Sequence, residues 1–98
     1  MNIYIIGSLS QKEVIEKTAE MYKEMGNDVK YVQPENKSLS EAINDCLKII
    51  ENWAHLVVAV PKQIYPEITL GDGVTYEIEY ARHLGTPVVI QYPNKRYI

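Results

Sequence analysis

The sequence contains a single cysteine, Cys46, and only two histidines, His55 and His83, which lie far apart. One cysteine excludes a disulfide framework and the paired cysteines of structural zinc sites, and the two histidines do not make a zinc site either. Basic residues are scattered and the net charge is −3, which argues against a nucleic-acid duplex or an anionic membrane as the main partner. The opening apolar run, residues 3–6, is far too short for a signal peptide or a membrane span. We therefore expect a soluble, cytoplasmic protein without a bound metal or cofactor.

The chain alternates between strand-like and helix-like segments. Its 98 residues, 46% of them hydrophobic, suffice for a single domain, residues 1–98. Short apolar runs predict four strands, and segments with helical spacing that begin near residues 10, 38 and 72 predict three helices between them. This order predicts a three-layer α/β domain of the Rossmann-like or flavodoxin-like kind, with helices on both faces of a parallel sheet and strand order 2-1-3-4. The predicted strands are residues 2–6, 28–32, 56–60 and 88–92, of which the second is half polar and is placed at an edge.

The helix ends carry recognisable signals. Ser10, Ser38 and Asp72 are predicted N-terminal caps, and Gly26 and Gly85 are predicted to end the first and third helices. The second helix has an apolar stripe that includes Ile43, Cys46 and Ile50. The stripe predicted for the first helix comprises Val14, Thr18, Met21, Tyr22 and Met25, and both methionines are interpreted as core residues.

An acidic residue lies at the edge of the apolar stripe of the third helix. Val74, Ile78 and Ala81 form that stripe, Glu77 falls at its margin, and Glu79 points away from it. Burial raises the pKa of a carboxyl group, whereas a helix N-terminus and hydrogen-bond donors lower it. Glu77 is therefore a candidate for the partly desolvated carboxylate that a nucleophile or general base requires, although most helical glutamates are solvated surface charges.

The predicted topology gives this helix a position next to a ligand site. In parallel α/β sheets, ligands bind beyond the carboxyl ends of the strands, where the strand order reverses between strands 1 and 3. The turn at residues 7–8 and the loop at residues 61–73 flank that crevice. The first turns of the helix that carries Glu77 are expected at its rim.

Three stretches carry a family resemblance. They are Ile-Tyr-Ile-Ile-Gly-Ser at residues 3–8, Trp-Ala-His-Leu-Val-Val-Ala at residues 53–59, and Gly-Val-Thr-Tyr-Glu at residues 73–77, the last followed by Tyr80-Ala81 and by Leu-Gly-x-Pro-Val at residues 84–88. In this order they resemble the nucleoside 2-deoxyribosyltransferase family and the related deoxynucleoside monophosphate N-glycosidases. The resemblance covers most of the chain, and its third stretch is the most specific.

The resemblance implies a reaction and a set of site residues. Glu77 matches the nucleophile that attacks C1′ of a 2′-deoxynucleoside or its 5′-monophosphate and holds the sugar covalently, after which another base or water takes the sugar. Tyr4 matches a tyrosine that orients the nucleophile through a hydrogen bond; its other interpretation is a core tyrosine on a buried strand. Gly7 and Ser8 form either a substrate-binding turn or simply a turn. The remaining candidates for substrate binding are Asp72, Gly73 and, for stacking on the base, Tyr65.

The departures from the family pattern keep alternatives open. His55 stands where relatives carry aspartate, and Glu79 replaces a glycine. Both favour a second hypothesis, a module that binds a nucleotide or nucleotide-sugar without turnover. A third is a glycohydrolase of the NAD type. Because neighbouring subunits often complete the active site in this family, the resemblance also implies a homodimer or a larger homo-oligomer.

Overall fold

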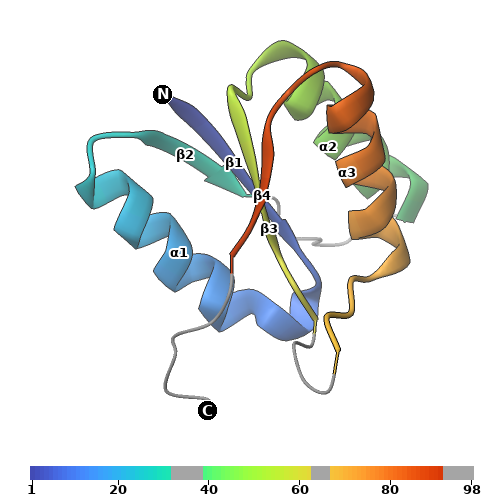
Figure 1. Cartoon of the computed structure of the whole chain (residues 1–98), viewed down its shortest axis with the longest axis horizontal. Helices are drawn as coiled ribbons and strands as arrows, with labels where there is room; N and C mark the ends of the chain where they lie inside the picture. The colour runs from blue at the N-terminus through green and yellow to red at the C-terminus, as the bar shows by residue number, and fades with distance from the viewer. Residues whose placement is uncertain (32–38, 63–66, 92–98) are drawn as a thin grey trace.

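The computed structural model of the chain describes residues 1–31, 39–62 and 67–91. In this part of the chain, strands and helices alternate and the four strands form one parallel sheet, as predicted (Figure 1). The strand order is β2-β1-β3-β4, which confirms the predicted 2-1-3-4 order. The strands are β1 (Asn2–Gly7), β2 (Asp28–Tyr31), β3 (Leu56–Val60) and β4 (Val88–Ile90), and the helices are α1 (Lys12–Glu24), α2 (Leu39–Asn52) and α3 (Asp72–His83).

The helices cover both faces of the sheet. Figure 1 shows α1 on one side and α2 with α3 on the other. Because side chains alternate along a strand, β1 sends Ile3 and Ile5 toward α1, and Tyr4 and Ile6 toward α2 and α3. The central strand β3 is buried on both faces, as its unbroken apolar run predicts, whereas β2 is an edge strand with alternating exposure.

The buried face of α1 differs from the predicted stripe. Met21 and Met25 are 40% and 68% exposed, so their interpretation as core residues is wrong. The helix buries Thr18, as the predicted stripe has it, together with Ile15 and Ala19, which lie outside that stripe. Ile15 packs closely over Gly7 at the end of β1, whereas Met21 lies on a more exposed side of α1 and Met25 follows its end.

Two of the predicted helix caps are also wrong. Helix α1 begins at Lys12 after a short 3-10 turn, η1 (Leu9–Gln11), and its N-cap residue makes no side-chain cap. The Ser10 hydroxyl instead lies 2.7 Å from the hydroxyl of Ser8. Helix α3 is capped by Gly71 without a side-chain bond, which leaves Asp72 as its first residue, where a carboxylate still interacts favourably with the helix dipole. The predicted cap at Ser38 lies outside the described residues.

The predicted helix ends are confirmed. Gly26 and Gly85 follow α1 and α3 with φ of 92° and 81°, a left-handed conformation that favours glycine. None of the described helices has the length and apolar character needed to cross a membrane.

Candidate active site

Glu77 lies in the interior, on the face of α3 that packs toward the sheet and α2. Only 8% of its surface is exposed, and Val74, Ile78 and Ala81 of the same helix are buried beside it. Glu79, by contrast, is exposed, as its place on the helix predicts. The spacing of the apolar residues therefore predicted the side of the helix on which Glu77 lies. The structure buries Glu77 more deeply than its predicted position at the edge of the stripe.

Burial changes the ionisation of this carboxyl. It raises the pKa of Glu77 from its ordinary value of 4.5 to about 7, and a hydrogen bond from Cys46 opposes part of that rise. Glu77 is the sixth residue of α3, beyond the first turn where the helix dipole acts most strongly. Near neutral pH the group is therefore divided between its acid and carboxylate forms, the range in which a carboxyl can serve as a nucleophile or a proton carrier.

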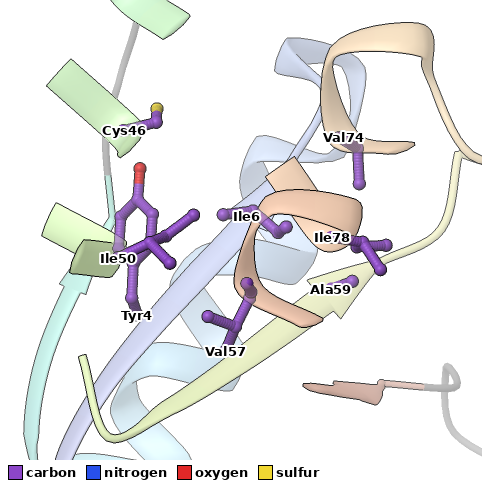
Figure 2. Close-up of a cluster of buried hydrophobic side chains, with 9 residues drawn as sticks. Tyr4, Ile6, Cys46, Ile50, Val57, Ala59, Val74 and Ile78 are labelled. Carbon is purple, nitrogen blue, oxygen red and sulfur yellow. The ribbon is translucent and has the colours of Figure 1, made fainter. Parts of the chain in front are cut away.

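Tyr4 approaches the same region from the sheet. It lies in the middle of β1 with 1% of its surface exposed, and Figure 2 shows its hydroxyl directed toward Cys46 of α2. Burial raises the pKa of Tyr4 far above its usual value, and the hydrogen bond to Cys46 and the nearby charges of Glu77 and Asp45 act in the same direction. The phenol therefore keeps its proton and is a hydrogen-bond donor throughout the physiological range.

Cys46 connects Tyr4 with Glu77. It is 8% exposed, and burial raises the pKa of its thiol to about 11, while the bond from Tyr4 lowers it and the charges of Glu77 and Asp45 raise it. The thiol sulfur accepts a hydrogen bond from the Tyr4 hydroxyl, and the thiol S–H donates one to the Glu77 carboxyl. The family resemblance implies a hydrogen bond from Tyr4 to the nucleophile. In the structure, the Tyr4 hydroxyl donates to Cys46 and not to the Glu77 carboxyl. In the part of the chain that the structure describes, no group of three or more His, Cys, Asp or Glu side chains is placed to hold a metal ion.

The sequence offered a partial signal for Cys46. It falls within the apolar stripe of α2, and that stripe predicts a buried side chain, which the structure confirms. The spacing does not indicate which residues of α2 and α3 meet, and their contact is what brings the thiol to the carboxyl. Sequence reasoning therefore found the burial of Cys46 and missed its partners.

Gly7 and Ser8 lie where β1 ends. A Cβ atom at Gly7 would stand 2.9 Å from Cδ1 of Ile15 and 3.2 Å from Cβ of Val60, so the close packing of α1 accounts for glycine at this position. The Ser8 hydroxyl is engaged with that of Ser10. Both residues keep their predicted place at the carboxyl edge of the sheet, and the contacts they make here are structural.

Asp72 and Gly73 form the first turn of α3. Asp72 is exposed, and a Cβ atom at Gly73 would meet nothing within 4 Å, so open space surrounds that residue. Side chains on an α-helix lean toward its N-terminus, and Glu77 follows Gly73 by one turn. Glu77 and Gly73 therefore lie one above the other on the same side of the helix. Tyr65 lies outside the described residues.

The loops that follow β1 and β3 are tied together at this edge. The side-chain amide of Gln11 donates to the carbonyl of Lys62 over 3.1 Å, and the backbone N–H of Lys62 donates to the carbonyl of Thr69 over 2.8 Å. His55 lies at the opposite edge, just before β3, where its Nδ1 accepts the backbone N–H of Asn2 over 3.0 Å. The departure from the family pattern at His55 thus falls at the amino ends of the strands.

A surface hollow of about 420 Å³ also opens at the amino ends of the strands. The Lys30 ammonium lies 4.6 Å from the centre of the Trp53 ring at its wall, a cation–π contact. The hollow is thus separate from Glu77 and Gly73. Its lining residues are Lys23, Asn27, Asp28, Val29, Lys30 and Trp53.

Comparison of the chain with models of known protein families finds no match, and no curated protein matches it.

Proposed function

We propose that the protein cleaves the N-glycosidic bond of 2′-deoxynucleosides or their 5′-monophosphates, with Glu77 as the nucleophile. The observation that supports this proposal is a carboxyl group that is 8% exposed, has a pKa of about 7, and accepts a hydrogen bond from a neutral thiol. The family resemblance of the motif that ends at Glu77 adds the substrate class.

The chemistry suits such a carboxyl. The carboxylate oxygen forms a bond to C1′ while the bond from C1′ to the base nitrogen breaks, and the base leaves with the electron pair and takes up a proton. A second base or water then attacks C1′, loses a proton to the solvent and releases Glu77 as the carboxylate, so that the two displacements retain the configuration. The sugar passes through an oxocarbenium-like state, which forms more readily without an electron-withdrawing 2′-hydroxyl. A carboxylate with little surrounding water interacts more strongly with that positive charge.

The surroundings of Glu77 are consistent with access from one side. The buried neighbours of Glu77 on α3 pack against the sheet and α2, and a Cβ added at Gly73, one turn before it, would meet nothing within 4 Å. We expect the sugar to approach over Gly73, near Asp72 and Ser8, with the base toward the loop after β3. We also expect a homodimer or larger assembly that acts in the cytoplasm, and light scattering of the purified protein tests the assembly.

The test is release of free base. The protein is incubated with each 2′-deoxynucleoside and each 5′-monophosphate, with and without a second base, and the free bases are separated by chromatography. Glu77→Gln removes the nucleophile and keeps the side-chain size, while Glu79→Gln changes an exposed acid two residues away on the same helix. We expect release by the wild type and by Glu79→Gln, and a loss of roughly a thousandfold or more in Glu77→Gln. Dependence of the release on the added base identifies a transferase, and release without it a hydrolase.

Other results would replace the proposal. If no substrate releases base and a deoxynucleotide binds equally well to the wild type and to Glu77→Gln, the domain is a binding module. Release of nicotinamide from NAD, with no release from deoxynucleosides, would indicate a glycohydrolase of the NAD type. Mass spectrometry of the intact protein adds a direct check, because the proposed intermediate carries one deoxyribosyl group on Glu77.

A further inference from the structure

We infer that Cys46 is a positioning residue, and that Tyr4 acts on the Glu77 carboxyl through the Cys46 thiol rather than directly. The inference rests on the proposed function for its catalytic meaning. The side-chain arrangement itself is a property of the protein without substrate, and it can be tested in that state.

The three side chains come from three different elements. Tyr4 extends from β1, Cys46 from α2 and Glu77 from α3, and each is at most 8% exposed. Figure 2 shows the Tyr4 ring rising from the strand, with its hydroxyl toward Cys46. Among the described residues, every buried side-chain nitrogen and oxygen has a hydrogen-bond partner, so the phenol is not left unpaired in the core. A polar connection thus crosses an otherwise apolar cluster.

The direction of the two bonds follows from the chemistry of the groups. The phenol O–H donates a hydrogen bond to the sulfur, and the S–H of the thiol then donates one to the carboxyl. Because the thiol ionises only near pH 11, it remains an uncharged donor at neutral pH and is not a nucleophile itself. The titratable groups that influence this pair of hydrogen bonds are Asp45 and Cys46 from α2, Tyr4 from β1 and Glu77 from α3.

An uncharged donor has a specific advantage here. A lysine or arginine beside Glu77 would form an ion pair, which would stabilise the carboxylate strongly and reduce its tendency to attack carbon. A thiol is a weak donor, so it orients one carboxyl oxygen and favours ionisation only modestly. The other oxygen then stays available for C1′. Tyr4 limits the directions open to the thiol proton, because its hydroxyl donates a hydrogen bond to the same sulfur.

The experiment is a titration of Glu77 by NMR of protein in which the glutamate carboxyl carbon is labelled, with Glu77→Gln identifying the signal. Cys46→Ala should move the titration midpoint upward by roughly 0.5–1 pH unit, because a donor to the carboxylate is lost. Cys46→Ser restores a donor and should return the midpoint toward the wild type. Tyr4→Phe should shift the midpoint in the same direction as Cys46→Ala, and in the Cys46→Ala background it should add little.

Two results would overturn the inference. One is a Glu77 midpoint that does not respond to Cys46→Ala, and the other is full additivity of the Tyr4→Phe and Cys46→Ala shifts, which would mean that Tyr4 acts directly. If Cys46→Ala does not fold, Cys46→Val has a similar volume and also lacks the donor, so it answers the same question.

The activity measurement separates this inference from the proposed function. In a protein that releases base, Cys46→Ala should lower kcat more than it raises KM and should move the rising limb of the pH profile upward, while Cys46→Ser reverses both changes. If Cys46→Ala releases base with an unchanged pH profile and an unchanged Glu77 midpoint, the role of Cys46 is contradicted and the proposed function is not. A shifted titration without base release from any substrate would contradict the proposed function alone.

Discussion

The burial of Glu77 has a direct consequence for stability that the Glu77→Gln variant isolates. Glutamine has nearly the shape of the protonated acid and stays neutral at every pH. The wild-type carboxyl has a higher pKa in the folded state than in the unfolded state, about 7 against 4.5, so the folded protein binds more protons between these values. Stability must then fall as the pH rises from about 4.5 to 7, because ionisation favours the unfolded chain.

The size of the effect follows from that difference in pKa. A change from 4.5 to about 7, at 1.36 kcal/mol for each factor of ten, corresponds to roughly 3 kcal/mol. Below about pH 4.5 the variant and the wild type should be equally stable to within about 1 kcal/mol, since an amide and a protonated carboxyl are similar. Above about pH 7 the variant should be more stable by roughly 3 kcal/mol.

Urea unfolding followed by circular dichroism between about pH 4.5 and 8 measures this difference. The difference in free energy of unfolding between variant and wild type cancels all other titrating groups, which are common to both proteins. Glu79→Gln is the matched control, because Glu79 is exposed on the same helix and its replacement should give a nearly constant difference. A constant difference for Glu77→Gln as well would refute the burial of this carboxyl and, with it, the physical basis of the proposed nucleophile.

Three further substitutions test the surroundings. Gly7→Ala should lower the free energy of unfolding by about 1–3 kcal/mol, because the new Cβ meets Ile15 at 2.9 Å, and adding Ile15→Val, which removes the contacting Cδ1, should reduce the loss in the same urea assay. Gly73→Ala should raise the free energy of unfolding by up to about 1 kcal/mol, since nothing lies near the added methyl group, and should slow base release if substrate crosses this surface. Lys30→Gln should lower stability by about 0.5 kcal/mol and change the fluorescence of Trp53, the only tryptophan, because the ammonium leaves its ring.

The pattern of apolar and polar residues in the strands predicted most of the fold. The unbroken apolar run at residues 56–60 predicted a strand covered on both faces, and the structure buries it in the middle of the sheet. The half-polar run that begins at Asp28 predicted an edge, and β2 is an edge strand. These predictions succeed because burial on two faces, one face or neither leaves different periodicities in a strand.

Helix details were less predictable, because they depend on contacts between distant segments. Met21 and Met25 have the same spacing as the true buried residues, and the close approach of Ile15 to Gly7 decides which face of α1 turns inward. Ser10 is a good capping residue by composition, yet its hydroxyl interacts with Ser8 and the helix begins two residues later. Local sequence signals could not rank these competing contacts.

The position of Glu77 was predictable and its chemistry was not. Wheel geometry placed it beside Val74, Ile78 and Ala81, and burial followed. Its pKa depends in addition on Cys46, and the ionisation of Cys46 depends on Tyr4. These side chains are far apart along the chain, and only the packing of β1, α2 and α3 brings them together.

The stability cost of Glu77 is itself an argument about function. Small domains are stable by about 5–15 kcal/mol, so a loss of roughly 3 kcal/mol at neutral pH is a large fraction of the total. Leucine or glutamine at this position would avoid that loss, because neither ionises in the core. Natural chains keep destabilising residues mainly where activity depends on them. The proposed reaction at Glu77 would account for a buried carboxyl that weakens the fold as it ionises, which packing alone does not.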